Sequence, residues 1–280
     1  MLERHLQDWR PDPVTGTDPM PVQPARALAA VLETGDELAA GAELPALWQW
    51  IYFQEWAAHS ELGSDGHPRA GRFLPPIPDR RRMFAGGRFR AEAPLLLGRE
   101  CTRTSSVDNA VVKQGRSGEM VLVTVRHEYH QDGALRLVEE QDYAYRSGET
   151  AAKDPAAHHV EPAASDAPWQ HSFTADPVLL FRYSALTANS HRIHYDAPYC
   201  REVERYPGLV VHGPLLVTLL CELVRRRSGA RVSAVDYRLR RPVFAGDPVL
   251  LTATPSGSGA QAAVRTGTDT AHATAEITLA

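Results

Sequence analysis

The sequence is poor in the residues that several common chemistries require. Only two lysines occur, Lys113 and Lys153, and neither lies in an apolar run that would activate it for Schiff-base formation. The three cysteines, Cys101, Cys200 and Cys221, are widely spaced and form no CxxC pair, which argues against a disulfide framework and a thiolate zinc site. We therefore expect free thiols in a reducing compartment.

Signal and nucleotide-binding motifs are also missing. The N-terminal residues MLERHLQDWRPDP carry charges throughout and lack the apolar core of a secretory signal or membrane anchor. No GxSxG elbow, GxxxxGK loop or GxGxxG turn supports a serine hydrolase or a nucleotide-driven enzyme. A net charge of −4 gives no electrostatic reason to bind nucleic acid or an anionic membrane. The sequence thus predicts a cytoplasmic protein with a small-molecule substrate and neither of those partners.

The chain is long enough for two modest domains. Its 280 residues, 43% of them hydrophobic, have the composition of a globular protein. Residues 147–170, SGETAAKDPAAHHVEPAASDAPWQ, are rich in alanine, proline and polar residues and have no helical or strand periodicity. We interpret them as a linker between an N-terminal domain, residues 1–146, and a C-terminal domain, residues 171–280.

The two halves share a pattern that indicates an internal duplication. FRAEAPLLLG, residues 89–98, and YRLRRPVFAG, residues 237–246, match in their aromatic, arginine, proline and glycine positions at a constant offset. Alternating strand-like segments follow each copy. Two copies of one fold are therefore expected.

Each half also contains one segment that is apolar enough to form a central helix. Residues 214–227 place apolar side chains four apart, begin with a proline and end before Gly229. Arg225, Arg226 and Arg227 complement the negative end of this helix, which we favour over a role in binding coenzyme A phosphates. LPALWQWIYFQEWA, residues 44–57, is the counterpart in the first half. The expected fold class is α+β, a double hotdog in which two antiparallel sheets each wrap around a central helix.

The most informative residues lie in the second half. FRYSALTANSHRIHYD, residues 181–196, followed by GLVVHGPLLVTLL, residues 208–220, resembles the hydratase motif of the MaoC-like family. RRMFAGGRFR and VRHEYHQDGALRLVEEQDYAYR resemble the N-terminal half of the mesaconyl-CoA hydratase and type 2 hydroxyacyl-thioester dehydratase branch. The resemblance implies a double hotdog enzyme that reversibly adds water to 2-enoyl thioesters, carried on coenzyme A or acyl carrier protein, without a cofactor.

Two residues match the family's catalytic positions. By this resemblance His194 is the catalytic histidine, and Gly213 is the glycine whose backbone N–H faces the thioester carbonyl oxygen. Hydration of a 2-enoyl thioester builds negative charge on that oxygen, and an N–H at a helix N-terminus stabilises such charge. An imidazole is suited to moving the accompanying proton near neutral pH.

The sequence departs from the family motif at three neighbouring positions. Asn189 stands where the family has a catalytic aspartate, and an amide cannot act as a general base. It could orient a water or His194, or serve the structure alone. His191 and Arg192 replace an asparagine and a proline, and Arg192 could pair with a substrate carboxylate such as that of a mesaconyl group or form a structural ion pair.

Other interpretations of the same residues remain open. We count His191 and His212 among the candidate substrate-binding residues, although His212 also suits a scaffold role. His191, His194 and Asp196 have an HxxHxD spacing, but no companion ligand is identifiable, so no metal is expected. Asp196 precedes Ala197 and Pro198 and is predicted to be a helix N-cap.

One active site per chain is expected, because the first half has no counterpart of the segment from Asn189 to His194. The N-terminal hotdog would then help to shape the acyl tunnel. Two alternatives to a hydratase stay open, a non-catalytic acyl-thioester-binding protein and a hotdog thioesterase. The acyl chain, the choice between coenzyme A and acyl carrier protein, and the formation of a homodimer are not determined by the sequence.

Overall fold

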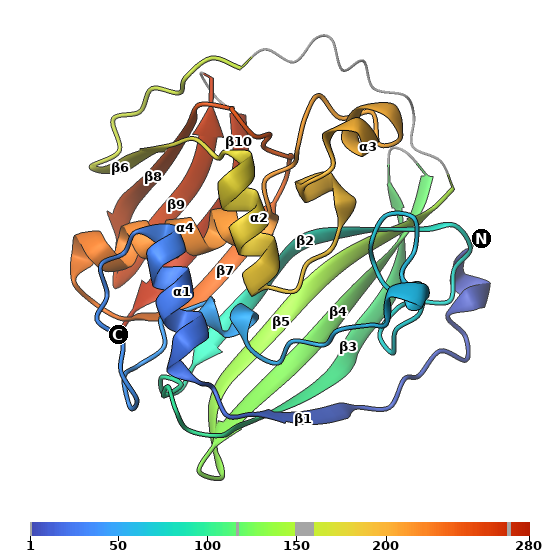
Figure 1. Ribbon diagram of the computed structural model, residues 1–280, viewed down its shortest axis with the longest axis horizontal. Coiled ribbons are helices and arrows are strands. Elements are labelled where there is room, and N and C mark those ends of the chain that lie inside the picture. The colour runs from blue at the N-terminus through green and yellow to red at the C-terminus, as the bar shows by residue number, and fades with distance from the viewer. Residues whose placement is uncertain (1, 116–117, 149–159, 268–269) are drawn as a thin grey trace.

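The strands form one antiparallel sheet that runs through both halves of the chain (Figure 1). A computed structural model describes residues 2–115, 118–148, 160–267 and 270–280. The strand order is β1-β3-β4-β5-β2-β7-β10-β9-β8-β6. The strands of the first half are β1 (Val14–Asp18), β2 (Arg80–Ala91), β3 (Cys101–Gly115), β4 (Gly118–Gln131) and β5 (Ala134–Ser147). Those of the second half are β6 (Trp169–Phe173), β7 (Val232–Leu239), β8 (Val249–Ser256), β9 (Gly259–Thr266) and β10 (Thr270–Leu279).

The two halves meet where β2 pairs with β7. This pairing is antiparallel and places Gly87 opposite Tyr237. A side chain at position 87 would lie 2.6 Å from the hydroxyl oxygen of Tyr237, so only glycine fits here. The two expected sheets are therefore joined edge to edge into one, and the double hotdog is a continuous structure.

The two matching segments make equivalent backbone hydrogen bonds, as an internal duplication predicts. Leu96 bridges to Glu43 after β2, and Phe244 bridges to Val210 at the same place after β7. The turn glycines of the two matching segments also behave alike. The N–H of Gly98 donates to the carbonyl of Met20, and the N–H of Gly246 donates to the carbonyl of Ala175. Both glycines have a positive φ. The two copies thus keep the same turn although most of their side chains differ.

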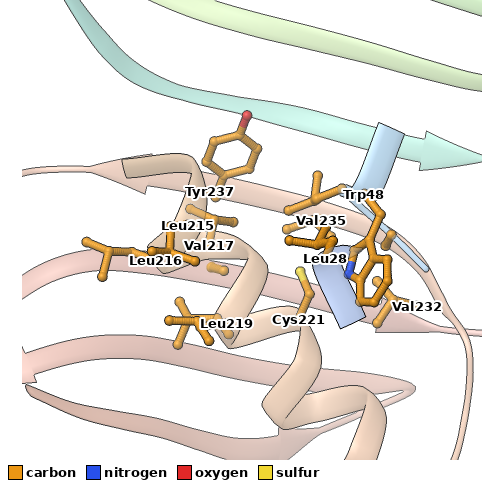
Figure 2. Close-up of a cluster of buried hydrophobic side chains, with 14 of the residues drawn as sticks. Leu28, Trp48, Leu215, Leu216, Val217, Leu219, Cys221, Val232, Val235 and Tyr237 are labelled. Atoms are coloured by element: carbon orange, nitrogen blue, oxygen red, sulfur yellow. The ribbon is translucent and has the colours of Figure 1, made fainter. Parts of the chain in front are cut away.

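A single long helix is wrapped by the strands of the second half. Helix α4 (Gly213–Ser228) contacts β6 to β10, and its residues from 215 to 224 are all buried. Pro214 lies in its first turn, and Gly229 ends it in the left-handed region at φ 69°. Figure 2 shows how its side chains meet Trp48 and Leu28 from the first half. The predicted helix over residues 214–227 is confirmed.

The predicted helix over residues 44–57 is wrong. Only a short 3-10 helix, η2 (Trp48–Ile51), forms there, and both Leu47 and Phe53 adopt positive φ. The indole nitrogen of Trp48 donates to Glu222 in α4, and that of Trp50 donates to the fully buried Glu139 in β5. These two partners lie in different halves, so the hydrogen bonds of the tryptophans override the local preference for a longer helix.

The remaining helices lie around these elements. Helices α1 (Val22–Leu32) and α2 (Pro177–Leu186) contact each other and lie in front of α4 in Figure 1. Shorter segments are α3 (Ala197–Glu202) and the 3-10 helices η1 (Leu2–His5), η3 (His59–Glu61) and η5 (Arg192–His194). No helix in the described residues is both long and apolar enough to cross a membrane.

The predicted linker lies between β5 and β6. Residues 149–159 lie outside the described residues, and residues 160–168 have no regular secondary structure. Ser147 is the last residue of β5 and Trp169 is the first of β6, so both ends of the predicted linker extend into strands. The division into residues 1–146, 147–170 and 171–280 stays a prediction.

We predict that Leu220→Ala destabilises the protein strongly. Leu220 is fully buried in α4, and truncating such a leucine typically costs about 2–5 kcal/mol. Denaturant unfolding followed by circular dichroism measures this free energy. Val203→Ala is the matched control because Val203 is 60% exposed, so that its free energy of unfolding should change by less than about 0.5 kcal/mol. Equal effects of the two substitutions would contradict the central position of α4.

Candidate active site

The site is built where α2, η5 and the start of α4 converge. Asn189 lies in the turn after α2, and its side-chain oxygen accepts a hydrogen bond from the backbone N–H of His191 at 3.1 Å. The amide therefore shapes the turn that leads into η5. Asp196 caps α3 by accepting the N–H of Tyr199 at 3.0 Å, as its sequence context predicts.

His194 is held in one tautomer by the backbone. Its Nδ1 lies 2.7 Å from the carbonyl oxygen of Val210, and the ring is buried. A carbonyl can only accept, so Nδ1 carries the hydrogen and Nε2 keeps a free lone pair. Burial lowers the pKa of His194 to about 4, although the bond to Val210 opposes this shift. His194 is therefore a neutral imidazole at neutral pH, with Nε2 available to accept a proton.

The first residue of α4 lies next to this imidazole. The ring of His212, the residue before Gly213, stacks on His194 with 3.6 Å between ring centroids. Within the described part of the chain, the N–H of Gly213 makes no hydrogen bond, as expected for the first N–H of a helix. A Cβ at position 213 would lie 2.3 Å from a methyl carbon of Leu239, so that glycine allows this close packing. The structure thus places the His194 ring against the residue that precedes the first N–H of α4.

His212 is braced from behind by α2. Its Nε2 lies 2.8 Å from the hydroxyl of Ser184, and its ring meets the edge of Tyr183. Burial and the neighbouring His194 and His191 keep the pKa of His212 well below its usual value. Its Nδ1 is buried without a hydrogen-bond partner among the described residues. These contacts fit the scaffold role, and a contact of His212 with substrate stays a prediction.

Arg192 is engaged in a structural ion pair. Its guanidinium lies 2.7 Å from a carboxylate oxygen of Asp196, donates to the carbonyl of Ser64 and stacks over the ring of Tyr199. This is the structural alternative to the predicted substrate contact. Among the described residues, His191, His194 and Asp196 do not bring their ligand atoms together as a metal cluster would.

A loop of the first half completes the site, and the sequence analysis missed it. The carbonyl of Asp65 accepts the N–H of Arg192 at 2.8 Å, and the carbonyl of Gly66 accepts the hydroxyl of Ser190 at 2.6 Å. This docking brings the ring centroid of His67 to 4.1 Å from the ring centroid of His191. More than 120 residues separate the partners in sequence, so the DGH pattern at residues 65–67 was the only signal available.

The loop at residues 65–67 carries a carboxylate that is hydrogen-bonded to an imidazole. Asp65 Oδ2 lies 3.0 Å from Nδ1 of His67. Burial alone would raise the pKa of Asp65, but hydrogen bonds from His67 lower it to about 2. Burial lowers the pKa of His67, while Asp65 opposes that shift. For His191, burial and the neighbouring His67 and His194 lower the pKa to about 2.

Metal-binding capacity is limited to one trio in the described ranges. Asp65, His67 and His191 each offer one ligand atom, and these atoms lie within 4.8 Å of one another. All three cysteines are buried free thiols.

A groove of about 810 Å³ lies elsewhere on the molecule. It is lined by residues 164–168 and by outward-facing residues of β7 to β10, such as Arg238 and Thr254. The core side chains that pack on α4, such as Val235 and Tyr237, alternate with these residues. The groove therefore lies on the opposite face of the sheet from the histidines.

The chain is similar in sequence to known acyl-thioester enzymes. The family model for hydroxyacyl-thioester dehydratase type 2 matches residues 47–245. A mesaconyl-C(4)-CoA hydratase from Chloroflexus aurantiacus is 46% identical over 83% of each chain. A mitochondrial hydroxyacyl-thioester dehydratase type 2 from Schizosaccharomyces pombe is 27% identical over 75% of this chain and 78% of its own.

Solved structures share the fold. A MaoC-like dehydratase superposes with a TM-score of 0.70 at 12% identity, covering 98% of this chain and 100% of its own. A Mycobacterium tuberculosis protein described as a double hotdog gives a TM-score of 0.59 at 13% identity, covering 96% of each chain. The predicted double hotdog is confirmed.

We predict that His194 remains neutral, with its proton on Nδ1, down to a pH of about 4. Nitrogen-15 NMR of the histidine rings across a pH series measures both properties, and His194→Gln identifies the signal. In the unfolded chain, the His194 imidazole takes up a proton near its ordinary pKa of 6.5. In the folded chain, it takes up that proton only when the pH falls to about 4. His194 should therefore reduce the free energy of unfolding as the pH falls from 6.5 towards 4. Titration near 6.5, or an Nε2–H tautomer, would contradict the geometry.

Proposed function

Because this chain belongs to the hydroxyacyl-thioester dehydratase type 2 family, we propose that it interconverts a 2-enoyl thioester and a 3-hydroxyacyl thioester at His194 and Gly213. The protein is accordingly a hydro-lyase. The observation that supports these two residues most directly is the neutral imidazole of His194, which stacks on His212, the residue that precedes the first N–H of α4.

His194 handles the proton in this proposal. During hydration, Nε2 accepts a proton from water while the water oxygen bonds to C3 of the thioester. The electron pair of the C2–C3 double bond moves towards the carbonyl and forms an enolate. That proton is then passed on to C2, so that the elements of water are added and His194 is neutral again.

Gly213 holds the charge that develops on the thioester oxygen. Its N–H projects from the N-terminus of a sixteen-residue helix, where the macrodipole favours negative charge. Gly213 is half-buried and the helix behind it is buried from Leu215 to Val224, which lowers the dielectric on the protein side of this interaction. A preorganised donor of this kind typically contributes about 10²–10³ in rate.

We expect His194→Gln to abolish most of the hydration of a 2-enoyl-CoA. A proton-transfer group typically contributes about 10²–10⁴ in kcat. Loss of enoyl absorbance with crotonyl-CoA or mesaconyl-CoA measures the rate. His171→Gln is the matched control, because His171 is exposed on β6. Wild-type turnover by the His194 variant would defeat the catalytic assignment, and release of free thiol by the wild type would identify a thioesterase instead.

For the substrate we propose a 2-enoyl-CoA with a second carboxylate, as in the mesaconyl group that the Chloroflexus relative's name gives. The cation available to bind that carboxylate is Arg82 rather than Arg192. Arg82 lies on β2 with its guanidinium carbon 5.3 Å from the ring centroid of Tyr143. Arg82 is exposed, and its charge contributes to lowering the pKa of both His67 and His191, so it lies within electrostatic reach of these rings. No carboxylate in the described ranges forms an ion pair with it.

Arg82→Gln should therefore change substrate preference. We expect kcat/KM for mesaconyl-CoA to fall by about tenfold or more, since a charged hydrogen bond contributes about 1.5–3 kcal/mol. For crotonyl-CoA, which has no second carboxylate, kcat/KM should stay nearly unchanged. Steady-state kinetics with both substrates provides the comparison. An equal loss for both would show that Arg82 acts on the fold and not on the carboxylate.

We also propose that the carrier is coenzyme A and that the protein acts in the cytoplasm. The free thiols of Cys101, Cys200 and Cys221 support a reducing compartment. The continuous sheet already joins two hotdog units within one chain, so a homodimer is not needed to pair them.

A further inference from the structure

The loop that carries Asp65 and His67 is docked by its backbone and not by these side chains. The carbonyls of Ser64, Asp65 and Gly66 accept hydrogen bonds from Arg192 and Ser190. A Cβ at position 66 would lie 2.0 Å from the carbonyl oxygen of Ser190, so glycine is needed for this approach. The hydrogen bonds that dock this loop on Ser190 and Arg192 are therefore accepted by its backbone and not made by the His67 imidazole.

The two side chains instead form a pair that faces the other histidines. Asp65 binds Nδ1 of His67, which leaves Nε2 without a hydrogen-bond partner among the residues that the structure describes. A carboxylate in this position fixes the tautomer of the imidazole and stabilises its protonated form. The His67 side chain is 19% exposed, so a proton can reach it from solvent.

His191 connects this pair to the proposed reaction centre. Its ring lies 4.1 Å from that of His67 and 5.7 Å, edge to face, from that of His194. Asn189 lies nearby but uses its side-chain oxygen in the turn, and an amide cannot carry a proton. Within the part of the chain that the structure describes, Asp65–His67 is a carboxylate-backed imidazole beside His191, and it comes from the other half of the chain.

We propose that His67, positioned by Asp65, is a second proton carrier that exchanges the hydrogen at C2, while His194 exchanges the proton of water. This inference rests on the proposed hydratase function. In hydration, His194 Nε2 takes a proton from water as oxygen bonds to C3, and the enolate forms. The proton then passes from His194 to His67 through His191 or water, and the His67 imidazolium gives it to C2, which leaves both groups neutral. Dehydration follows the same steps in reverse.

The first test is the kinetics of His67→Gln. We expect kcat for crotonyl-CoA hydration to fall by about 10²–10⁴ with little change in KM, as for the loss of a proton-transfer group. Asp65→Asn keeps a hydrogen-bond acceptor but loses the charge, and its kcat should lie between those of wild type and His67→Gln. His59→Gln is the control, since His59 is exposed on the same first-half segment. Circular dichroism and the thermal midpoint check that each variant is folded.

The second test separates the two histidines. Wild type, His67→Gln and His194→Gln are incubated with butyryl-CoA in heavy water, and deuterium at C2 is followed by mass spectrometry. If His67 exchanges the hydrogen at C2 and His194 the proton of water, His194→Gln should still exchange the C2 hydrogen and His67→Gln should not. A single carrier predicts the opposite pattern, which would overturn the proposal.

Two further outcomes decide the matter. Hydration that is lost in His194→Gln but unchanged in His67→Gln leaves the proposed function standing and rejects the second carrier. Stoichiometric metal in the purified protein, with activity lost to a chelator and restored by Zn²⁺, would make His67 a metal ligand and would also reject it. Absence of hydration in the wild type is a failure of the proposed function itself.

Discussion

The hydrogen bond from Nδ1 of His194 to the carbonyl of Val210 is the interaction on which the rest of the site depends. It fixes which nitrogen of the imidazole is free, and it ties η5 to the segment that leads into α4. The N–H of Val210 donates back to Ile193 at 2.8 Å, and Val211 donates to Val243 after β7. The segments that carry the imidazole and lead to the helix end are thus tied in place by backbone hydrogen bonds.

Among the described residues, the two halves differ at the position where α4 begins in the second half. In the second half, the bridge at Val210 leads directly into α4, and Gly213 presents the first N–H of a long helix. In the first half, the equivalent bridge at Glu43 leads into a four-residue 3-10 helix, which has little macrodipole to offer. The first half contributes otherwise, through the Asp65–His67 loop and through tryptophans that bond to buried carboxylates.

Features with a local signal could be predicted from the sequence, and those that depend on contacts between the halves could not. The helix over residues 214–227, the cap at Asp196 and the duplicated glycine turns each have a short-range cause and are confirmed. The segment at residues 44–57 has a helical pattern, but Trp48 and Trp50 have partners that no local pattern reveals. The pairing of Arg192 with Asp196 was one of two alternatives, since the sequence cannot show which group lies nearer. Asp65 and His67 were missed because only the fold brings them beside His191.

The central claim is that the thioester lies between His194 and the start of α4. A crystal structure of His194→Gln with bound crotonyl-CoA tests this directly, since the variant should bind substrate without converting it. The account predicts a thioester oxygen about 2.7–3.1 Å from the backbone nitrogen of Gly213, with C3 beside the side chain at position 194. An acyl group in the groove on the outer face of the sheet, or a thioester oxygen directed away from Gly213, would contradict it.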